Sequence, residues 1–250
     1  MYTKVKTDTE IAAMRKAGHI LATVLKELSS EVRVGVTTKE LSELAEQKIA
    51  TMGGKPSFKG YNGFPDALCA SVNDAVVHGI PSDLPLQDGD VVGMDLGVTY
   101  GGMIVDGAIT VVVGSIDNEV KKLLDVTKKS LHEGLKQIRD GCFTGDIGAA
   151  VEAVLAKNNY GIVRELVGHG VGHHVHEDPN IPNYGKKRSG DRLVSGMTIA
   201  VEPMATLGQE DIYIDKDKWT VRTKDGSIAA HFEHTVLITD QGCEILTLAD

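Results

Sequence analysis

Hydrophobic residues recur at helical spacing in two pairs of segments, and the first pair lies near the N-terminus. Its segments begin at Thr7 and Thr37, and each threonine is followed three residues later by glutamate, the spacing of a capping box. The apolar period continues to about Ser30 after the first threonine and to Gly53 and Gly54 after the second. The pattern therefore predicts a long helix followed by a shorter one.

The second pair has the same organisation in the middle of the chain. Asp117 is expected to cap a helix that Gly141 stops, and Thr144 is expected to cap the next helix. Gly35 aligns with Gly141 and Thr38 with Thr144, both at an offset of 106 residues. Because this Gly-x-x-Thr motif recurs at the start of the same helix, we expect two duplicated halves.

Strand-like sequence follows each helix pair. The expected strands are Leu68–Val72, Val91–Tyr100, Met103–Val113, Ile162–Val167, Met197–Met204, Asp211–Ile214 and His231–Thr239. Because helices and strands form separate blocks, the pattern predicts an α+β fold with a mainly antiparallel sheet. No linker interrupts the chain, so we expect a single domain, 1–250, with similar halves at about 1–115 and 116–250.

The composition is that of a globular protein. Hydrophobic residues make up 42% of the 250 residues and charged residues 24%, which excludes a disordered chain. No run approaches about 18 uncharged apolar residues, and the N-terminus lacks the apolar core of a secretory signal. The three cysteines, Cys69, Cys142 and Cys243, are too widely spaced for a disulfide framework. We expect a cytoplasmic protein that does not bind membranes.

The formal net charge of −9 comes from 35 acidic and 26 basic residues. The longest basic run, Lys186 to Arg188, is too short for a nucleic-acid surface, so nucleic acid is not expected as a partner. The acidic surplus either keeps the protein soluble or supplies metal ligands. The positions of the acids in the predicted strands decide between these interpretations.

Four carboxylates lie inside the most apolar strand-like stretches. They are Asp95, Asp106, Glu202 and Glu233. Acidic residues are disfavoured in strands and are rarely buried without a partner. A single one would more often be the solvent-facing member of an alternating strand. Four together, with no lysine or arginine beside them in the sequence, favour a bound cation.

Asp95 and Asp106 are expected to face each other across a hairpin. A turn that is symmetric about Tyr100 and Gly101 pairs the two directly, and the Gly101–Gly102 dipeptide suits a tight turn. Directly paired residues have Cβ atoms about 5 Å apart. Carboxylates this close repel each other and raise a pKa unless a cation lies between them. The hairpin therefore also predicts a metal.

The segment GHGVGHHVHEDP supplies a nitrogen ligand. His169 and His173 are four residues apart, as in a zinc-binding helix, but the glycines at 168, 170 and 172 disfavour a helix. These glycines indicate close backbone packing around an extended segment. His169 is therefore a candidate ligand or catalytic residue, with a structural or solvated histidine as the alternative.

These motifs resemble those of the type I methionine aminopeptidases, metallopeptidases of the pita-bread fold, over essentially the whole chain. The resemblance lies in NGFPDALCASVNDAVVHGIP, GDVVGMDLGV, LVGHGVGHHVHEDP, GMTIAVEPM and FEHTVLIT. It implies five metal ligands, namely Asp95, Asp106, His169, Glu202 and Glu233. Only 31 residues separate the two glutamates, which leaves no room for the insertion typical of the second type. It also implies two similar halves with the metals between them.

The resemblance implies a site with two divalent ions. Four carboxylates and one neutral imidazole carry a formal charge of −4, which two such ions cancel. Asp95 would chelate one metal, His169 with Glu202 would hold the other, and Asp106 with Glu233 would bridge both. This donor set suits Fe²⁺, Mn²⁺, Co²⁺ or Zn²⁺. Such a pair activates a shared water and polarises a carbonyl group.

The resemblance further implies removal of the N-terminal methionine from peptides and nascent chains. Glu202 would take the proton of the attacking water, His176 would contact the scissile carbonyl oxygen, and His78 would bond near the leaving nitrogen. The structural alternative for both histidines is a buried, hydrogen-bonded imidazole. The wall of the methionine pocket is expected from Tyr61, Phe64, Cys69, His78 and Trp219.

Several positions differ from the family pattern. Val175 stands where the family usually has Phe, and Phe58 stands where a small residue is common, so that the second change can compensate for the first. Asn62 replaces a frequent His, and Gly107 stands where Thr is common. These differences affect the pocket and the surroundings of the ligands, and they leave the five ligands intact.

Two other functions remain open at this point. A pita-bread peptidase that cuts before proline is one, although such enzymes usually carry an extra N-terminal domain. A metal-free binding relative is the other, although all five ligands are present. We expect a monomer. The ribosome is considered as a further partner.

Overall fold

The computed structural model describes residues 3–248 of the chain. The helices are α1 (Asp8–Glu31), α2 (Thr38–Thr51), α3 (Asn118–Leu135) and α4 (Thr144–Lys157), with a short 3₁₀ helix η1 at Tyr61–Gly63. The strands are β1 (Lys55–Pro56), β2 (Leu68–Val72), β3 (Ala75–Val77), β4 (Val91–Tyr100), β5 (Met103–Val112), β6 (Gly161–Ile162), β7 (Gly168–Gly170), β8 (Glu177–Ile181), β9 (Thr198–Val201), β10 (Met204–Thr206), β11 (Ile212–Ile214), β12 (Val221–Thr223), β13 (Ala229–His231), β14 (Glu233–Ile238) and β15 (Cys243–Ile245).

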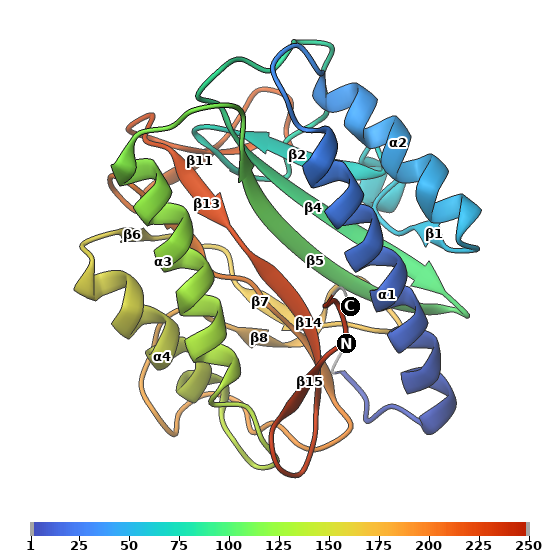
Figure 1. Ribbon diagram of the computed structural model, residues 1–250. Coiled ribbons are helices and arrows are strands. Elements are labelled where there is room, and N and C mark those ends of the chain that lie inside the picture. The colour runs from blue at the N-terminus through green and yellow to red at the C-terminus, as the bar shows by residue number, and fades with distance from the viewer. Residues whose placement is uncertain (1–2, 249–250) are drawn as a thin grey trace.

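A nine-stranded antiparallel sheet forms the centre of the molecule. Its main order is β1-β4-β5-β14-β9-β7-β8, with β2 added to β4 and β15 added to β14. Two small sheets, β13-β10-β6 and β11-β12-β3, complete the fold. Helices α1 and α3 lie in front of the strands in Figure 1, with α2 and α4 to their outer sides. The predicted α+β class is confirmed.

Capping boxes begin α1 and α2, as the Thr-x-x-Glu spacing predicts. The hydroxyl of Thr7 accepts a hydrogen bond from the backbone N–H of Glu10 at 3.3 Å, and the Glu10 carboxylate accepts one from Thr7 N–H at 2.8 Å. Thr37 and Glu40 form the same reciprocal pair. These bonds fix the starts of both helices.

The start of α4 differs from the prediction. Phe143, not Thr144, is the N-cap residue, and the carboxylate of Asp146 accepts a hydrogen bond from its backbone N–H at 2.9 Å. The hydroxyl of Thr144 instead accepts a hydrogen bond from the backbone N–H of Asp191 at 3.2 Å. The start of α4 is therefore held by the carboxylate of Asp146, which bonds the N–H of the N-cap residue, and not by the side chain of the threonine.

The end of α3 also differs, because the helix stops at Leu135 and does not reach Gly141. The intervening residues pair with other segments. The N–H of Asp140 donates to the carbonyl of Thr239 at 3.1 Å, and that of Gly141 donates to the carbonyl of Leu193 at 2.8 Å. These long-range bonds satisfy backbone groups that would otherwise continue the helix.

Two of the seven predicted strands, β2 and β4, have the predicted bounds, and β5 ends one residue early. The long strands predicted for the second half are wrong in part. Only residues 161–162 near the predicted Ile162–Val167 form a strand, and β9 and β10 are separate strands of different sheets. Pro203 lies between β9 and β10 and has no N–H for the ladder. A similar change of sheet separates β13 from β14 at Phe232.

The predicted register of the β4–β5 hairpin is wrong by two residues. Asp95 pairs with Ala108, and Asp106 pairs with Gly97. The cause is a two-residue turn at Gly101–Gly102, where both φ angles are positive, at 58° and 81°. Because the shift is even, both carboxylates still lie on one face of the sheet as diagonal neighbours.

The duplicated halves, 1–115 and 116–250, stay a prediction, which the helices support. Helices α2 and α4 each have 14 residues, and their first residues, Thr38 and Thr144, stand at the predicted offset. One apolar cluster joins α1 and α2 to β2, β4 and β5, and another joins α3 and α4 to β9 and β14. Within residues 3–248, no helix combines the length and hydrophobicity needed to span a bilayer.

The packing of α1 against the end of the chain gives a stability prediction. Gly18 is buried inside α1, and a Cβ atom added there would overlap the backbone carbonyl of Leu246. In an exposed helix, Gly→Ala adds about 1 kcal/mol of stability. Gly18→Ala should instead lower the free energy of unfolding by about 1–3 kcal/mol, the usual effect of overpacking.

Urea denaturation measures this change directly. Lys16→Ala, at an exposed position of the same helix, is the control and should change stability by less than about 0.5 kcal/mol. A stabilised Gly18→Ala variant would contradict the packing described for α1.

Candidate metal centre

Because side chains alternate along a strand, those of Asp95 and Asp106 point away from the helices. Met94 and Leu96, the neighbours of Asp95 in β4, are buried in the cluster under α1 and α2. Successive side chains of a strand point to opposite faces, so Asp95 lies on the other face. Asp106 does the same in β5, because its neighbour Val105 belongs to that cluster. Both carboxylates line a cavity of about 260 Å³.

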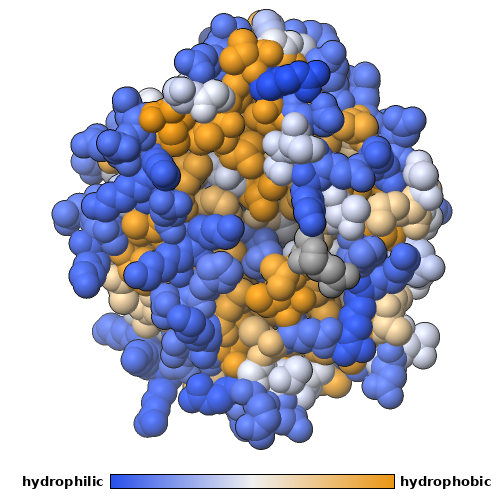
Figure 2. Space-filling model, in the orientation of Figure 1, coloured by the Kyte–Doolittle hydropathy of each residue, from blue (hydrophilic) through white to orange (hydrophobic). Residues whose placement is uncertain are grey.

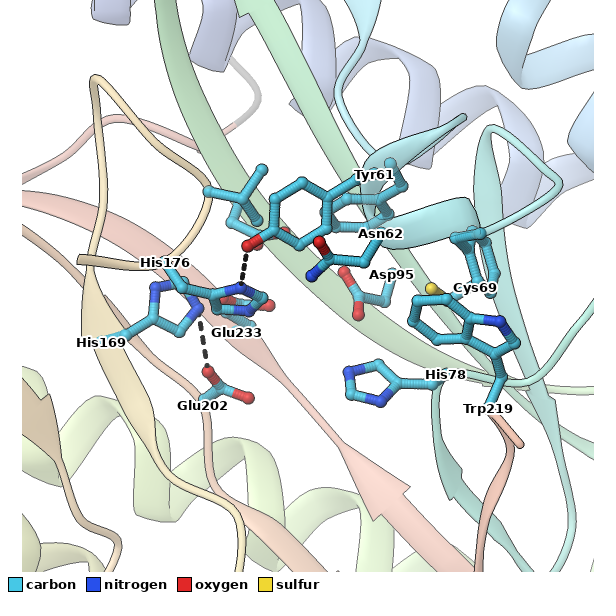
Figure 3. Close-up of a pocket in the computed structure, with 14 residues that line it drawn as sticks. Tyr61, Asn62, Cys69, His78, Asp95, His169, His176, Glu202, Trp219 and Glu233 are labelled. Atoms are coloured by element: carbon cyan, nitrogen blue, oxygen red, sulfur yellow. Dashed lines mark hydrogen bonds and ion pairs between the residues drawn. The ribbon is translucent and has the colours of Figure 1, made fainter. Parts of the chain in front are cut away.

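The second half of the chain contributes the other three predicted ligands. His169 in β7, Glu202 directly after β9 and Glu233 at the start of β14 line the same cavity (Figure 3). One ligand atom each from Asp106, His169 and Glu233 lie within 4.8 Å of one another. Nε2 of His169 is 3.4 Å from Oε1 of Glu202. The structure thus brings all five residues to one cavity.

Burial and mutual repulsion make the carboxylates difficult to ionise by themselves. Burial raises the pKa of Asp95 to about 7. Burial, followed by repulsion from neighbouring carboxylates, raises the pKa values of Asp106, Glu202 and Glu233 well above their usual range. No lysine or arginine is among the cavity-lining residues in the described part of the chain. Ionisation of all four carboxylates together therefore requires positive charge from a bound cation.

The donor atoms fit divalent cations. Oδ1 of Asp95 and Oε1 of Glu233 are buried, and neither has a hydrogen-bond partner among residues 3–248. Burial lowers the pKa of His169 to about 3, so its ring is neutral, as a metal ligand must be. Nδ1 of His169 donates to the carbonyl of Gly170 at 2.9 Å, which leaves the lone pair of Nε2 facing the carboxylates. Four carboxylates and one imidazole suit a transition-metal ion.

The two predicted catalytic histidines also line the cavity. The ring of His176 packs edge-on against that of His169, with centroids 4.4 Å apart, and Nδ1 of His176 lies 3.0 Å from the hydroxyl of Tyr61. His78 lies across the cavity from His176 in Figure 3. Burial, with a smaller contribution from His176, lowers the pKa of His78 to about 4, and burial lowers the pKa of His176 as well. Both rings are therefore neutral hydrogen-bonding groups near pH 7.

Apart from Asn62, the rest of the cavity wall is mainly aromatic and apolar. All five residues predicted for the methionine pocket line it, and the rings of Phe64 and Trp219 meet edge-to-face at 5.2 Å. Burial raises the pKa of the Cys69 thiol well above its usual range, so this residue is a pocket wall and not a nucleophile. Phe58 and Val175 line the same wall, and each is less than 10% exposed.

Sequence reasoning missed His231. It is 3% exposed, its Nε2 has no hydrogen-bond partner in the described chain, and this atom lies 3.7 Å from Glu202 and 3.9 Å from Glu233. The only local signal was its position two residues before Glu233 in an apolar segment. His231 therefore lies beside two of the five predicted ligands, although it does not itself line the cavity.

Comparison with known proteins gives the same result for family and fold. Residues 12–240 match the model of metallopeptidase family M24. Methionine aminopeptidase 1 of Bacillus subtilis is 46% identical over 97% of this chain and 98% of its own length. The methionine aminopeptidase of Clostridium acetobutylicum is 44% identical over 98% of this chain and 99% of its own length.

Solved structures agree with these relatives. The methionine aminopeptidase of Rickettsia prowazekii has a TM-score of 0.96 at 39% identity, and covers 98% of this chain and 100% of its own. That of Thermotoga maritima has a TM-score of 0.97 at 41% identity, and the match covers 98% of this chain and 99% of the Thermotoga chain. The prolidase of Pyrococcus furiosus, at 24% identity, shares the fold alone, with a TM-score of 0.80 and 66% of its length covered. The predicted pita-bread fold is confirmed.

Proposed function

Because the chain belongs to metallopeptidase family M24, and within it to the methionine aminopeptidases, we propose that it removes N-terminal methionine and that its five clustered side chains would hold two divalent metal ions for this reaction. The observation that carries this proposal is the cavity itself, which four carboxylates line, three of them buried, with no cationic side chain among the described residues that line it. The substrates are peptides and nascent chains with an N-terminal methionine.

Each ligand has a distinct place in the proposed centre. Asp95 would hold one ion, His169 and Glu202 would hold the other, and Asp106 and Glu233 would be ligands shared by both. Fe²⁺, Mn²⁺, Co²⁺ or Zn²⁺ suits these donors. Bound metal supplies a Lewis acid for the peptide carbonyl and lowers the pKa of a bound water. The side chains of the protein carry out the proton transfers and the hydrogen bonding to the peptide.

Glu202 is the proposed general base. Its side chain is 12% exposed, its Oε1 lies 3.4 Å from Nε2 of His169, and it lines the same cavity as the other acids. In the proposed reaction Glu202 takes a proton from the attacking water and delivers it to the leaving amine.

His176 and His78 are the proposed hydrogen-bond donors to the peptide. Nδ1 of His176 lies 3.0 Å from the hydroxyl of Tyr61, and with this hydroxyl as the donor the neutral ring would carry its proton on Nε2. This N–H can donate to the carbonyl oxygen as negative charge develops there. His78, which lies on the other side of the cavity in Figure 3, would contact the leaving nitrogen. The apolar wall between them receives the methionine side chain.

Peptide cleavage tests this function against the proline-specific alternative. The protein is loaded separately with each of the four metals and assayed on a Met-Ala-Ser peptide and on an Ala-Pro-Ser peptide. We expect methionine release from the first peptide and no cleavage of the second. Cleavage of the Ala-Pro bond alone, or no methionine release with any metal, would overturn the proposal.

The pocket gives a specificity prediction. Phe58 and Val175 both line it, and Phe58 packs so closely on Gly97 that an added Cβ would lie 2.6 Å from the ring. Val175→Phe should therefore overfill the pocket and raise KM for Met-Ala-Ser about tenfold, since overpacking costs about 1–3 kcal/mol and 1.4 kcal/mol is a factor of ten. The Phe58→Ala/Val175→Phe double variant should restore KM to within about threefold.

Steady-state kinetics of the single and double variants measures this compensation. Equal KM values for Val175→Phe and the double variant would show that the two side chains do not share the methionine pocket.

A further inference from the structure

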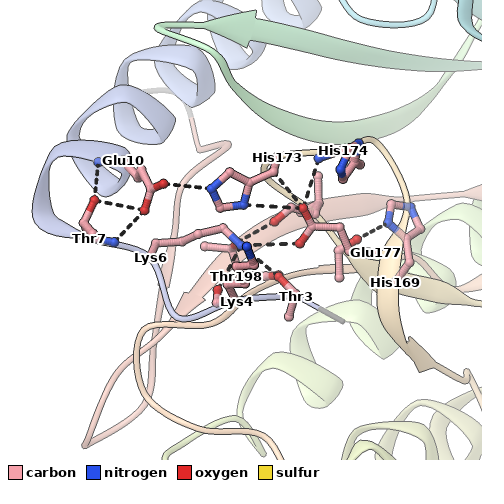
Figure 4. A network of polar contacts seen from close by, with 12 residues as sticks. Thr3, Lys4, Lys6, Thr7, Glu10, His169, His173, His174, Glu177 and Thr198 are labelled. Atoms are coloured by element: carbon pink, nitrogen blue, oxygen red, sulfur yellow. Dashed lines mark hydrogen bonds and ion pairs between the residues drawn. The ribbon is translucent and has the colours of Figure 1, made fainter. Parts of the chain in front are cut away.

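The N-terminal strap, residues 3–10, crosses the hairpin that carries His176. In Figure 4 it runs beside the histidine loop, residues 171–176, which connects β7 to β8. The backbone N–H of Thr3 donates to the carbonyl of Asp178 in β8, and that of Lys6 donates to the carbonyl of Gly196 at 2.8 Å. The strap is thus bonded to segments about 170–190 residues away in sequence.

Glycines in the hairpin make room for this strap. A Cβ atom added at Gly170 would lie 2.7 Å from Cβ of Thr3, and one added at Gly172 would overlap the side chain of Lys6. At Gly172 the φ angle is also positive, at 148°. The glycines around the histidines therefore permit close packing of the N-terminal residues, which is what their spacing indicated.

A buried ion pair joins the strap to the loop. Nζ of Lys6 lies 3.4 Å from Oε2 of Glu177, and the two side chains are 0% and 2% exposed. The same ammonium donates to the hydroxyl of Thr3 at 2.9 Å and to the carbonyl of Lys4 at 3.0 Å. Burial alone would raise the pKa of Glu177, but the bond to Thr3 and the charge of Lys6 outweigh it and lower that pKa. Glu177 is therefore an ionised carboxylate at neutral pH.

The other oxygen of Glu177 holds the histidine loop. Oε1 accepts hydrogen bonds from the backbone N–H of His173 at 2.8 Å and of His174 at 3.0 Å. The strap adds a second tie, because Oε1 of Glu10 lies 2.7 Å from Nε2 of His173. These bonds fix the loop on the side that faces the strap.

The fixed loop ends at His176, the residue directly before Glu177. On its other side the carbonyl of Gly172 accepts a hydrogen bond from the N–H of Ile104 at 2.7 Å, two residues before Asp106. The loop is therefore held between the strap and the strand that carries a predicted metal ligand. Small displacements of a catalytic group are costly, since about 1 Å can reduce a rate a hundredfold.

We infer that Glu177 is a positioning residue that orients His176 toward the substrate, and that Lys6 of the strap holds Glu177 in place. This inference rests on the proposed role of His176. Glu177 is not among the residues that line the cavity. It acts through the loop, and its substitution should change kcat while leaving KM and metal content nearly unchanged.

A double-mutant cycle tests the inference. Glu177→Gln should lower kcat on Met-Ala-Ser by about 10–100-fold, with KM changed by less than about twofold. In a His176→Ala background, the same substitution should change kcat by less than about twofold, because no ring remains to be oriented. Glu165→Gln, an exposed substitution of the same type, is the control and should match the wild type.

Removing both charges of the buried ion pair should restore part of the activity that is lost when only one charge is removed. Lys6→Met leaves the Glu177 charge buried and unpaired, and should lower kcat as Glu177→Gln does. The Lys6→Met/Glu177→Gln double variant removes both charges and keeps a carbonyl oxygen for the two loop N–H groups. It should recover kcat to within about tenfold of the wild type.

A spectroscopic measurement keeps the inference testable without activity. In protein with ¹³C-labelled histidines, Glu177→Gln should shift the ring resonance of His176, assigned from its absence in His176→Ala, and leave that of half-buried His132 unchanged. Additive losses in the cycle, an unmoved His176 resonance or a loss of metal from Glu177→Gln would overturn the inference. Absence of methionine release by the wild type would instead refute the proposed function.

Discussion

Asp106→Asn should lower kcat/KM for methionine release by at least about a thousandfold and should reduce the uptake of divalent metal. Asp106 is the proposed bridge between the two ions, and one of its oxygens lies within 4.8 Å of donor atoms of His169 and Glu233. Loss of the bridge removes a Lewis-acid contribution worth several kcal/mol, and about 1.4 kcal/mol is a factor of ten in rate. Peptide kinetics and metal analysis of the same sample measure both effects.

Unfolding should not account for that loss. Asp106 is buried beside other carboxylates that repel its ionised form, so replacing it with a neutral amide removes this repulsion when metal is absent. The metal-free variant should therefore be at least as stable as the metal-free wild type in thermal denaturation. Asp125→Asn, an exposed change in α3, is the matched control and should keep full activity. A fully active Asp106→Asn enzyme with two bound ions would contradict the proposed centre.

Glu202→Gln should lower kcat by about 10²–10⁴-fold, the usual contribution of a general base. The amide keeps the size of the side chain and one oxygen, but it cannot accept the proton of the attacking water. Since Glu202 does not form the apolar wall of the pocket, KM should change by less than about threefold. Glu43→Gln, at an exposed position in α2, should behave as the wild type.

Metal titration of the Glu202→Gln variant distinguishes the role of general base from that of a metal ligand alone. Saturating metal should restore the metal content of Glu202→Gln but not its rate. Recovery of the wild-type rate at high metal would show that Glu202 is a ligand only, and that another group moves the proton.

The local pattern of the sequence predicted the four helices and identified acids that line one cavity. Capping boxes at Thr7 and Thr37 fixed the starts of two helices, because their hydrogen bonds lie within four residues. The acids at Asp95 and Asp106 stood out because neighbouring strand positions are buried under helices. Both signals are local, so one sequence was sufficient to identify them.

The errors concern tertiary contacts. The register of the β4–β5 hairpin depends on whether its turn contains two residues or is centred elsewhere, and the run of glycines permits both. The strands of the second half are broken because the chain passes between sheets at Pro203 and Phe232 while its apolar pattern continues. Periodicity describes which face is buried, not which sheet the residue joins.

The groups that sequence reasoning missed act over long distances in the chain. The ion pair between Lys6 and Glu177 joins residues 171 positions apart, and no local pattern marks a buried lysine as the partner of a particular acid. His231 approaches Glu202 from a different strand. The resemblance to a family provided the roles of His78 and His176, which spacing alone left as candidates for buried structural histidines.

Anomalous X-ray diffraction from crystals of the Mn²⁺-loaded protein tests the central claim most directly. The account predicts two manganese peaks roughly 3.5–4 Å apart, both within bonding distance of Asp106 and Glu233, with Asp95 on one and His169 with Glu202 on the other. No peak among these side chains, or a single ion that leaves Asp95 or His169 without a metal, would contradict it.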